Sequence, residues 1–393
     1  MVTGRIWAGL VCLIACAAFA DEGHDNRNPV SILNPPAELG ASAVFAPDGS
    51  LWAASKEGGH VVVRRSADRG LSWSVAQRVN RVAEAVAADG DSRPKIAIGV
   101  QGDLYVTWTK PLSRPYTGDV RFSRSLDGGQ HFDAPLTVHT DRQEITHRFD
   151  ALAVNAEGKV FVAWIDKRDI ETARKLRRDY PGAAVYVAIS SDRGASFAGD
   201  RRIADHSCEC CRIALLPRPD GSVLALWRHV FPPNVRDHAL AKIRPDGSAD
   251  MLQRATFDNW RIDACPHHGP GLAADASGQL HAVWFSGGSR SGVFYGRLGD
   301  GRIGGQRRVG GDGAAHADIA ADGRRILIVW KQFDGQQTQL RAEVSDDHGV
   351  SWQPHLLATT AQATDQPRAL FHDGRFLVFW HGAERPFGTY ELP

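Results

Sequence analysis

The sequence predicts an all-β protein, a β-propeller of seven four-stranded blades. Three observations support this fold class. An apolar pair, a turn with Gly and a run of alternating apolar residues recur along the chain, and most copies end on Trp. Those Trp residues stand at positions 108, 164, 227, 284, 330 and 380, a spacing close to one four-stranded blade. Alternation with period two is typical of strands, and no long segment has a convincing helical period.

Each repeat is expected to form the two strands nearest the channel axis. In chain order these hairpins are expected in 44–51, 96–108, 152–164, 213–227, 272–284, 319–330 and 370–380. A short helix is expected only in 168–180, as an insertion in the third blade. After the seventh hairpin little chain remains, and 29–33 (Pro-Val-Ser-Ile-Leu) is similar to the outermost strands. We therefore expect an N-terminal strand to complete the last blade and close the ring, with six blades as the alternative.

Four turns between the expected third and fourth strands share the motif S-x-D-x-G-x-x-[WF]. They lie at 66–73, 125–132, 190–197 and 345–352. The Asp can accept hydrogen bonds from the loop backbone, the Gly can take a positive φ, and the aromatic ring can pack against the blade. The motif resembles the Asp box of the sialidase and BNR-repeat families. This resemblance implies a propeller in which the boxes lie away from the catalytic face, so they indicate the fold and not the activity.

Residues 1–20 have the pattern of an export signal. Arg5 precedes an apolar stretch, and Ala18-Phe19-Ala20 has the form of a signal peptidase site. Residues 21–393 are then expected to be a single propeller domain, periplasmic or secreted. Because 13–16 (Leu-Ile-Ala-Cys) resembles a lipobox, a lipoprotein anchored through Cys16 is the alternative. A charged content of 23% and a net charge of +1 favour neither nucleic acid nor, beyond such an anchor, a membrane as partner.

Two short segments, 206–212 and 263–268, contain every cysteine that follows the export signal. Thiolate and imidazole are ligands for soft and borderline metal ions, and residues just before the inner strands of consecutive blades should rim one mouth of the channel. The candidate ligands are Cys208, Cys210, Cys211, Cys265, His267, His268 and His316. We predict a site for a soft ion, copper before zinc, in metal homeostasis or metal-dependent redox chemistry, with the ion and a periplasmic protein as partners. Structural disulfides in a non-catalytic interaction scaffold are an alternative.

The family resemblance implies another alternative, an exo-sialidase-like glycoside hydrolase. Sialidases use an arginine cluster to hold a carboxylate, a Tyr nucleophile with a Glu partner and an Asp acid/base. Arg93, Arg148, Arg212 and Arg368 could bind such an anion, or could hydrogen-bond within the channel wall. The chain has no Phe/Tyr-Arg-Ile-Pro motif before its first blade and no evident Tyr-Glu pair. The sequence alone therefore leaves open whether the protein is an enzyme.

Overall fold

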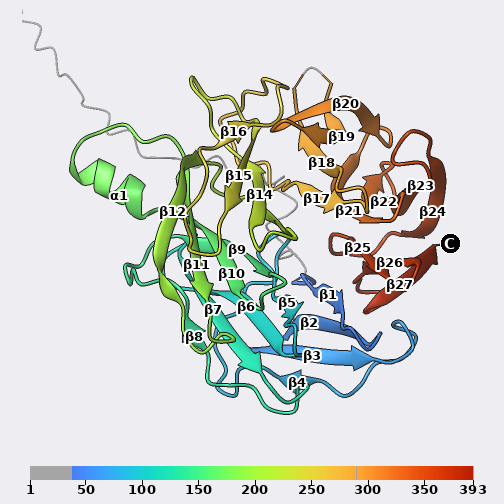
Figure 1. Ribbon diagram of the computed structural model, residues 1–393, viewed down its shortest axis with the longest axis horizontal. Coiled ribbons are helices and arrows are strands. Elements are labelled where there is room, and N and C mark those ends of the chain that lie inside the picture. Colours follow the sequence, from blue (N-terminus) through green and yellow to red (C-terminus); the bar gives the residue numbers. More distant parts are fainter. Residues whose placement is uncertain (1–37, 289, 393) are drawn as a thin grey trace, which may run out of the picture. The chain divides into compact units, whose positions relative to one another are not determined.

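Seven antiparallel sheets follow one another around a central axis (Figure 1). The computed structural model describes residues 38–288 and 290–392. The first three blades are β1 (Ser42–Phe45), β2 (Leu51–Glu57), β3 (His60–Ser66) and β4 (Gln77–Arg78), then β5 (Lys95–Ile98), β6 (Leu104–Pro111), β7 (Gly118–Ser125) and β8 (Leu136–Thr137), then β9 (His147–Val154), β10 (Val160–Asp166), β11 (Ala183–Ser190) and β12 (Ala198–Ser207). These sheets confirm the predicted seven-bladed propeller.

The other four blades repeat the pattern. They are β13 (Ala214–Pro217), β14 (Val223–Arg228), β15 (His238–Ile243) and β16 (Gln253–Arg254), then β17 (Gly271–Ala274), β18 (Leu280–Ser286), β19 (Gly292–Gly299) and β20 (Arg302–Val309), then β21 (Ala314–Asp322), β22 (Arg325–Phe333), β23 (Thr338–Ser345) and β24 (Gln353–Thr360), then β25 (Arg368–His372), β26 (Arg375–Trp380) and β27 (Gly388–Leu392). The last blade has three strands among the described residues. The predicted closing strand, 29–33, lies outside them.

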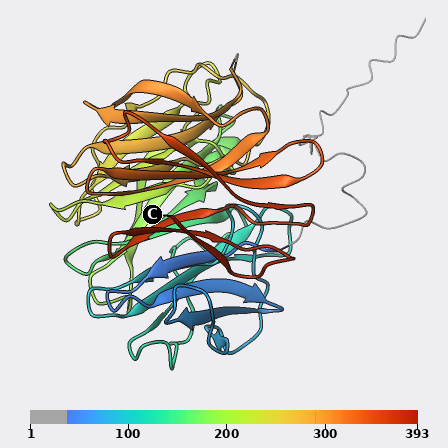
Figure 2. The same ribbon diagram turned by 90° about the vertical axis from the view of Figure 1, so that its right-hand side faces the viewer.

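The first strand of each blade contacts the first strands of its neighbours, and β25 contacts β1. Figure 2 shows the red strands of the last blade beside the blue strands of the first. The ring is thus closed by contact between the first and last blades.

Tryptophans at the ends of the second strands fill the space between blades. Trp108, Trp164 and Trp227 are fully buried, and Trp284 is nearly so. Burying a large aromatic side chain removes 150–250 Å² of mostly apolar surface from water, about 4 kcal/mol or more at 25 cal/mol per Å². The regular spacing of Trp in the sequence therefore reflects one packing position repeated around the ring.

The Asp boxes form tight turns between third and fourth strands. In the first box, Asp68 Oδ1 accepts hydrogen bonds from Ser66 Oγ at 2.7 Å and from the backbone N of Ser72 at 2.8 Å, and Gly70 has a φ of +90°. The same Asp contacts recur in the other three boxes. The boxes are structural turns, as the motif predicted.

The connections between blades and the loops between second and third strands lie at the opposite end of the blades from the Asp boxes. The loop after β10 holds the helix α1 (Arg168–Lys175), which is shorter than the predicted range 168–180. It is the only helix among the described residues, and none of them forms a helix suited to crossing a membrane.

Two inner strands are distorted near this end. Two residues of β9 lie opposite Trp164 of β10, and two residues of β21 lie opposite Trp330 of β22, where a regular ladder has one. Phe149 and His316, which lie in these bulges, have φ values of +54° and +55°. A non-glycine residue with positive φ is strained, and bulges redirect side chains. Both distortions occur near the mouth of the channel where the candidate site lies.

Candidate functional site

Three thiols meet in the connection from β12 to β13. The Sγ of Cys208 lies 3.9 Å from the Sγ of Cys210 and 3.8 Å from the Sγ of Cys211, and the three sulfurs lie within 4.8 Å of one another. All three side chains are buried. A disulfide would hold two sulfurs at about 2.05 Å, so these residues are free thiols in this structure.

A fourth cysteine joins them from the next blade connection. Cys265 lies between β16 and β17 and is exposed. The side chain of Cys210 is the largest influence on the pKa of Cys265 and lowers it, so the two side chains lie close together. We call Cys208, Cys210, Cys211 and Cys265 the thiol cluster. The two segments that sequence analysis expected to converge do meet, although they belong to different blades.

Two arginines place positive charge against the thiol cluster. Arg236 Nη1 donates to the sulfur of Cys208 at 3.7 Å. Arg228 is almost fully buried, and its guanidinium donates to the carbonyl oxygens of Arg236, His268 and Phe285 at 3.0, 3.1 and 2.7 Å. Within the described part of the chain, neither guanidinium has a carboxylate oxygen within the 4.0 Å of an ion pair. A buried cation needs a counter-charge, and the thiol cluster can supply one.

The hydrogen bonds within the thiol cluster separate donors from acceptors. Bonds from Cys210 and Cys211, helped by Arg228 and Arg236, hold the pKa of Cys208 well below its ordinary value. The same bonds raise the pKa of Cys210 and Cys211. The side chain of Cys210 lowers the pKa of Cys265. Within the thiol cluster, the surroundings thus favour the thiolate more at Cys208 and Cys265 than at Cys210 and Cys211, and the thiolate is the form in which cysteine binds metals.

The predicted histidines lie at the mouth without entering the group of three buried thiols. His268 and His316 have ring centroids 4.4 Å apart, and Phe285 stacks on the other side of His268 at 4.0 Å. The Nδ1 atoms of both histidines are buried and have no hydrogen-bond partner among the described residues. Burial lowers the pKa of His268 to about 4 and that of His316 well below its usual range. His267 is exposed and lies 6.3 Å from the ring of Phe149.

Three of the four predicted anion-binding arginines are already paired with carboxylates. The pairs are Arg93 Nη1 with Asp365 Oδ2 at 2.6 Å, Arg212 Nη1 with Asp91 Oδ1 at 3.2 Å, and Arg368 Nε with Asp318 Oδ2 at 3.3 Å. A guanidinium already paired with a carboxylate has less positive potential to offer a bound anion. This arrangement favours the channel-wall role over a carboxylate clamp for these three.

Arg148 differs from the other three arginines. It has no carboxylate at ion-pair distance among the described residues, its Nε is buried without a hydrogen-bond partner there, and its guanidinium packs over the ring of Phe149 at 5.1 Å. Burial lowers its pKa, opposed by the negative charge of Asp89, and burial raises the pKa of Asp89. Arg148 is thus an incompletely satisfied cation near the mouth, and Cys210 lies within its electrostatic reach.

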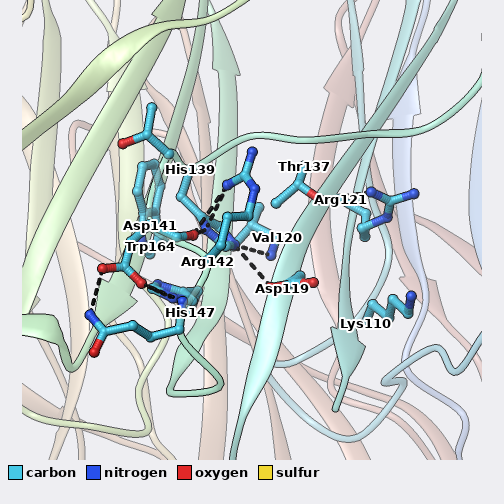
Figure 3. Close-up of polar contacts among 12 residues, drawn as sticks. Lys110, Asp119, Val120, Arg121, Thr137, His139, Asp141, Arg142, His147 and Trp164 are labelled. Carbon is cyan, nitrogen blue, oxygen red and sulfur yellow. Dashed lines mark hydrogen bonds and ion pairs between the residues drawn. The ribbon is translucent and has the colours of Figure 1, made fainter.

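A second buried polar cluster lies between the second and third blades (Figure 3). His139 and His147 are both fully buried, and their rings stack with centroids 3.9 Å apart. The backbone N of Val120 donates to His139 Nε2 at 3.2 Å, so His139 Nδ1 carries the proton and donates to the carbonyl O of Asp141 at 2.6 Å. His147 Nδ1 bonds Asp166 Oδ2 at 2.9 Å. This cluster joins blades, and none of the contacts described for its members reaches the thiol cluster.

Arg228 and Arg236 are not among the site residues predicted from the sequence. Arg228 follows the blade residue Trp227, and the corresponding positions in neighbouring blades are Ile165 and Phe285. The only indication in the sequence was that Arg228 is charged, whereas the equivalent residue is apolar in the blade before it and in the blade after it. Arg236 lies in a loop where a basic residue is ordinary, so its role depends on the fold.

Comparisons with protein-family models and with curated proteins gave no match. Solved structures do resemble the chain. A polysaccharide lyase of family PL25, an ulvan lyase bound to a GlcA–Rha3S saccharide, matches with a TM-score of 0.55 at 11% identity, over 89% of this chain and 90% of that one. The Hadza microbial sialidase Hz136 matches with a TM-score of 0.50 at 15% identity, over 86% and 71%.

An α-L-arabinofuranosidase, Arb93A from Fusarium graminearum, also matches with a TM-score of 0.50 at 14% identity, over 78% of this chain and 92% of that one. At these identities the likeness establishes a shared propeller fold. It agrees with the sialidase-like fold that the Asp boxes indicated.

Proposed function

We propose that the protein binds a single soft metal ion, Cu(I), through the thiol cluster. The observation that carries the proposal is the spacing of the three buried sulfurs, 3.8 and 3.9 Å from Cys208 to its two neighbours. Ligands at about 2.3 Å from one ion stand about 3.8 Å apart in a tetrahedron and about 4.0 Å apart in a trigonal plane. The thiols are therefore already spaced as a ligand set.

Charge and softness favour Cu(I) in this proposal. A thiolate-only ligand set selects soft ions, and Zn(II) is the other ion that thiolates bind well. A monovalent ion held by three thiolates carries net negative charge, which Arg228 and Arg236 are placed to balance. Cys265 is the proposed fourth ligand, while His267, His268 and His316 line the mouth next to the ion. The proposal includes export to the periplasm or cell exterior, where the protein would take part in metal homeostasis.

Anaerobic titration tests this function. The protein, purified with its thiols reduced, is titrated with Cu(I) against a colorimetric chelator, and thiols are counted before and after loading. We expect one ion per chain and protection of the thiol cluster from alkylation. Cys210→Ser and Cys211→Ser should each abolish tight binding, whereas Ser207→Ala, next to the cluster, should bind as the wild type does. Unchanged affinity in both cysteine variants would refute the proposal.

A second candidate is a carbohydrate-active enzyme, a glycoside hydrolase or polysaccharide lyase. The matched propeller structures are such enzymes, and Arg148 is a buried cation with an unsatisfied Nε near the mouth, where an acidic sugar could be bound. Asp89, whose pKa is raised by burial, and the exposed Tyr116 lie within electrostatic reach of Arg148.

This candidate is tested with fluorogenic sialosides, arabinofuranosides and uronate-containing polysaccharides, following the reducing ends or the unsaturated uronate released. Turnover that Arg148→Gln abolishes and Arg368→Gln leaves in place would establish it. Lack of turnover on all three substrate classes would reject it.

A further inference from the structure

The loop that contains α1 carries a strongly basic surface. This insertion, residues 167–180, has six basic and three acidic side chains, a net charge of +3 in a chain whose total is +1. Its residues Arg174, Lys175, Leu176, Arg177 and Arg178, which we call the basic run, are all exposed, and Leu176 is 56% exposed. Figure 1 shows α1 outside the ring of strands, beyond β12.

Both ends of the insertion are tied to the segment 205–211, which carries the three buried cysteines at the end of β12 and in the connection after it. Lys167 forms an ion pair with Glu209, which stands between Cys208 and Cys210. At the other end, the hydroxyl of Tyr180 donates to Asp205 Oδ1 at 2.6 Å. The charges of Lys167 and Glu209 also reach Cys265. The position of the basic run is therefore fixed relative to the thiol cluster.

Stabilisation of the helix explains the presence of only some of the cations in the basic run. Arg174 and Lys175 lie in the last turn, where cations interact favourably with the helix dipole, and Arg174 pairs with Glu171 at 2.8 Å. Arg177 and Arg178 lie beyond the end of the helix at Lys175, so neither reason applies to them. Four cations and an exposed Leu beside a metal-binding mouth form a surface suited to an acidic partner.

We infer that the basic run is a docking surface for an acidic protein that delivers a soft metal ion to Cys265. The inference rests on the proposed function. Cys265 is the exposed member of the thiol cluster, so an incoming ion reaches it before the three buried thiols. In the transfer, a bond from the ion to the sulfur of Cys265 forms as a bond to a donor sulfur breaks. Each thiolate keeps its electron pair, and the oxidation state of the ion does not change.

The experiment compares two donor peptides. Both contain one Cys-Gly-Gly-Cys segment loaded with Cu(I); one is flanked by Glu and the other by Lys. Transfer to the full-length protein is followed by stopped-flow at low and high salt, and the final occupancy is measured separately.

Two variants with the same loss of charge are compared with the wild type. The test variant is Lys175→Gln, Arg177→Gln and Arg178→Gln, and the control is Arg65→Gln, Arg324→Gln and Arg375→Gln. The control residues lie at the Asp-box end of the blades, away from the thiol cluster.

Electrostatic attraction between an exposed charged surface and its partner raises association rates by about tenfold or more at low salt. We expect transfer from the Glu peptide to slow by about tenfold in the test variant and not in the control, with the difference disappearing at high salt. The Lys peptide should transfer no more slowly to the test variant than to the wild type. Equal rates from the Glu peptide in all three proteins, with full occupancy reached, would overturn the docking surface and leave the metal site standing. No occupancy from either peptide would overturn both.

Discussion

Buried neutral histidines should make the protein sensitive to acid, and His139 allows a quantitative test. Burial, with the neighbouring His147, lowers the pKa of His139 from 6.5 to about 3. In the unfolded chain, the His139 side chain is therefore protonated below about pH 6.5, whereas in the folded protein it is protonated only below about pH 3. Stability falls as the pH falls through this window. From these two pKa values, His139 should cost about 2 kcal/mol of stability between roughly pH 7.5 and roughly pH 5.

The perturbation is His139→Gln, which retains an acceptor for the backbone N of Val120 and removes the titration. The variant should be less stable than the wild type near pH 7.5, because the ring stacking with His147 and the bond to Asp141 are lost. The difference in free energy of unfolding between the wild type and the variant should narrow by about 2 kcal/mol as the pH falls to roughly 5. Buried histidines that do not contact His139 contribute equally in both proteins and cancel.

Urea denaturation of metal-free protein at a series of pH values measures this gap. The control is His355→Gln, the same substitution on the outer strand β24, away from His139. A gap for His139→Gln that stays constant or widens with acidity would show that His139 is not held neutral by its surroundings.

Four further outcomes are expected. Cys210→Ser or Cys265→Ser should remove most bound copper while the propeller stays folded, whereas His316→Ala should only weaken binding, as metal analysis and circular dichroism will show. Arg236→Gln should lower Cu(I) affinity by about tenfold, roughly 1.4 kcal/mol, and Arg236→Lys should restore much of it in chelator competition; equal affinities would remove the counter-charge role. Trp284→Ala should destabilise the fold by about 3–5 kcal/mol in urea denaturation, because its side chain is buried between blades. A fluorogenic sialoside should not be hydrolysed, because three of the four candidate arginines are paired with carboxylates, and measurable turnover would contradict this.

The blades and their number were predictable from the sequence because their determinants are local. Alternation with period two specifies a strand that has one face packed, and the Asp-box turn depends on contacts between residues two to four positions apart, such as Ser66, Asp68 and Ser72. The blade tryptophans recur because every blade packs on the next in the same way. The convergence of the cysteine segments was also predictable, since it follows from their equivalent positions in neighbouring blades.

The charge state of the site depended on tertiary structure. In the sequence, Arg93, Arg148 and Arg228 are equivalent cations next to predicted inner strands. In the fold, Arg93 is paired with Asp365, distant in the sequence, while Arg148 and Arg228 have no ion-pair partner among the described residues, and Arg228 donates its hydrogen bonds to carbonyl oxygens. Coulomb energy depends on distance and burial, and the closed ring sets both for residues far apart in the chain. The sequence by itself therefore determined the propeller and the place where soft ligands gather, and only the tertiary structure decided which cations remain available to balance them.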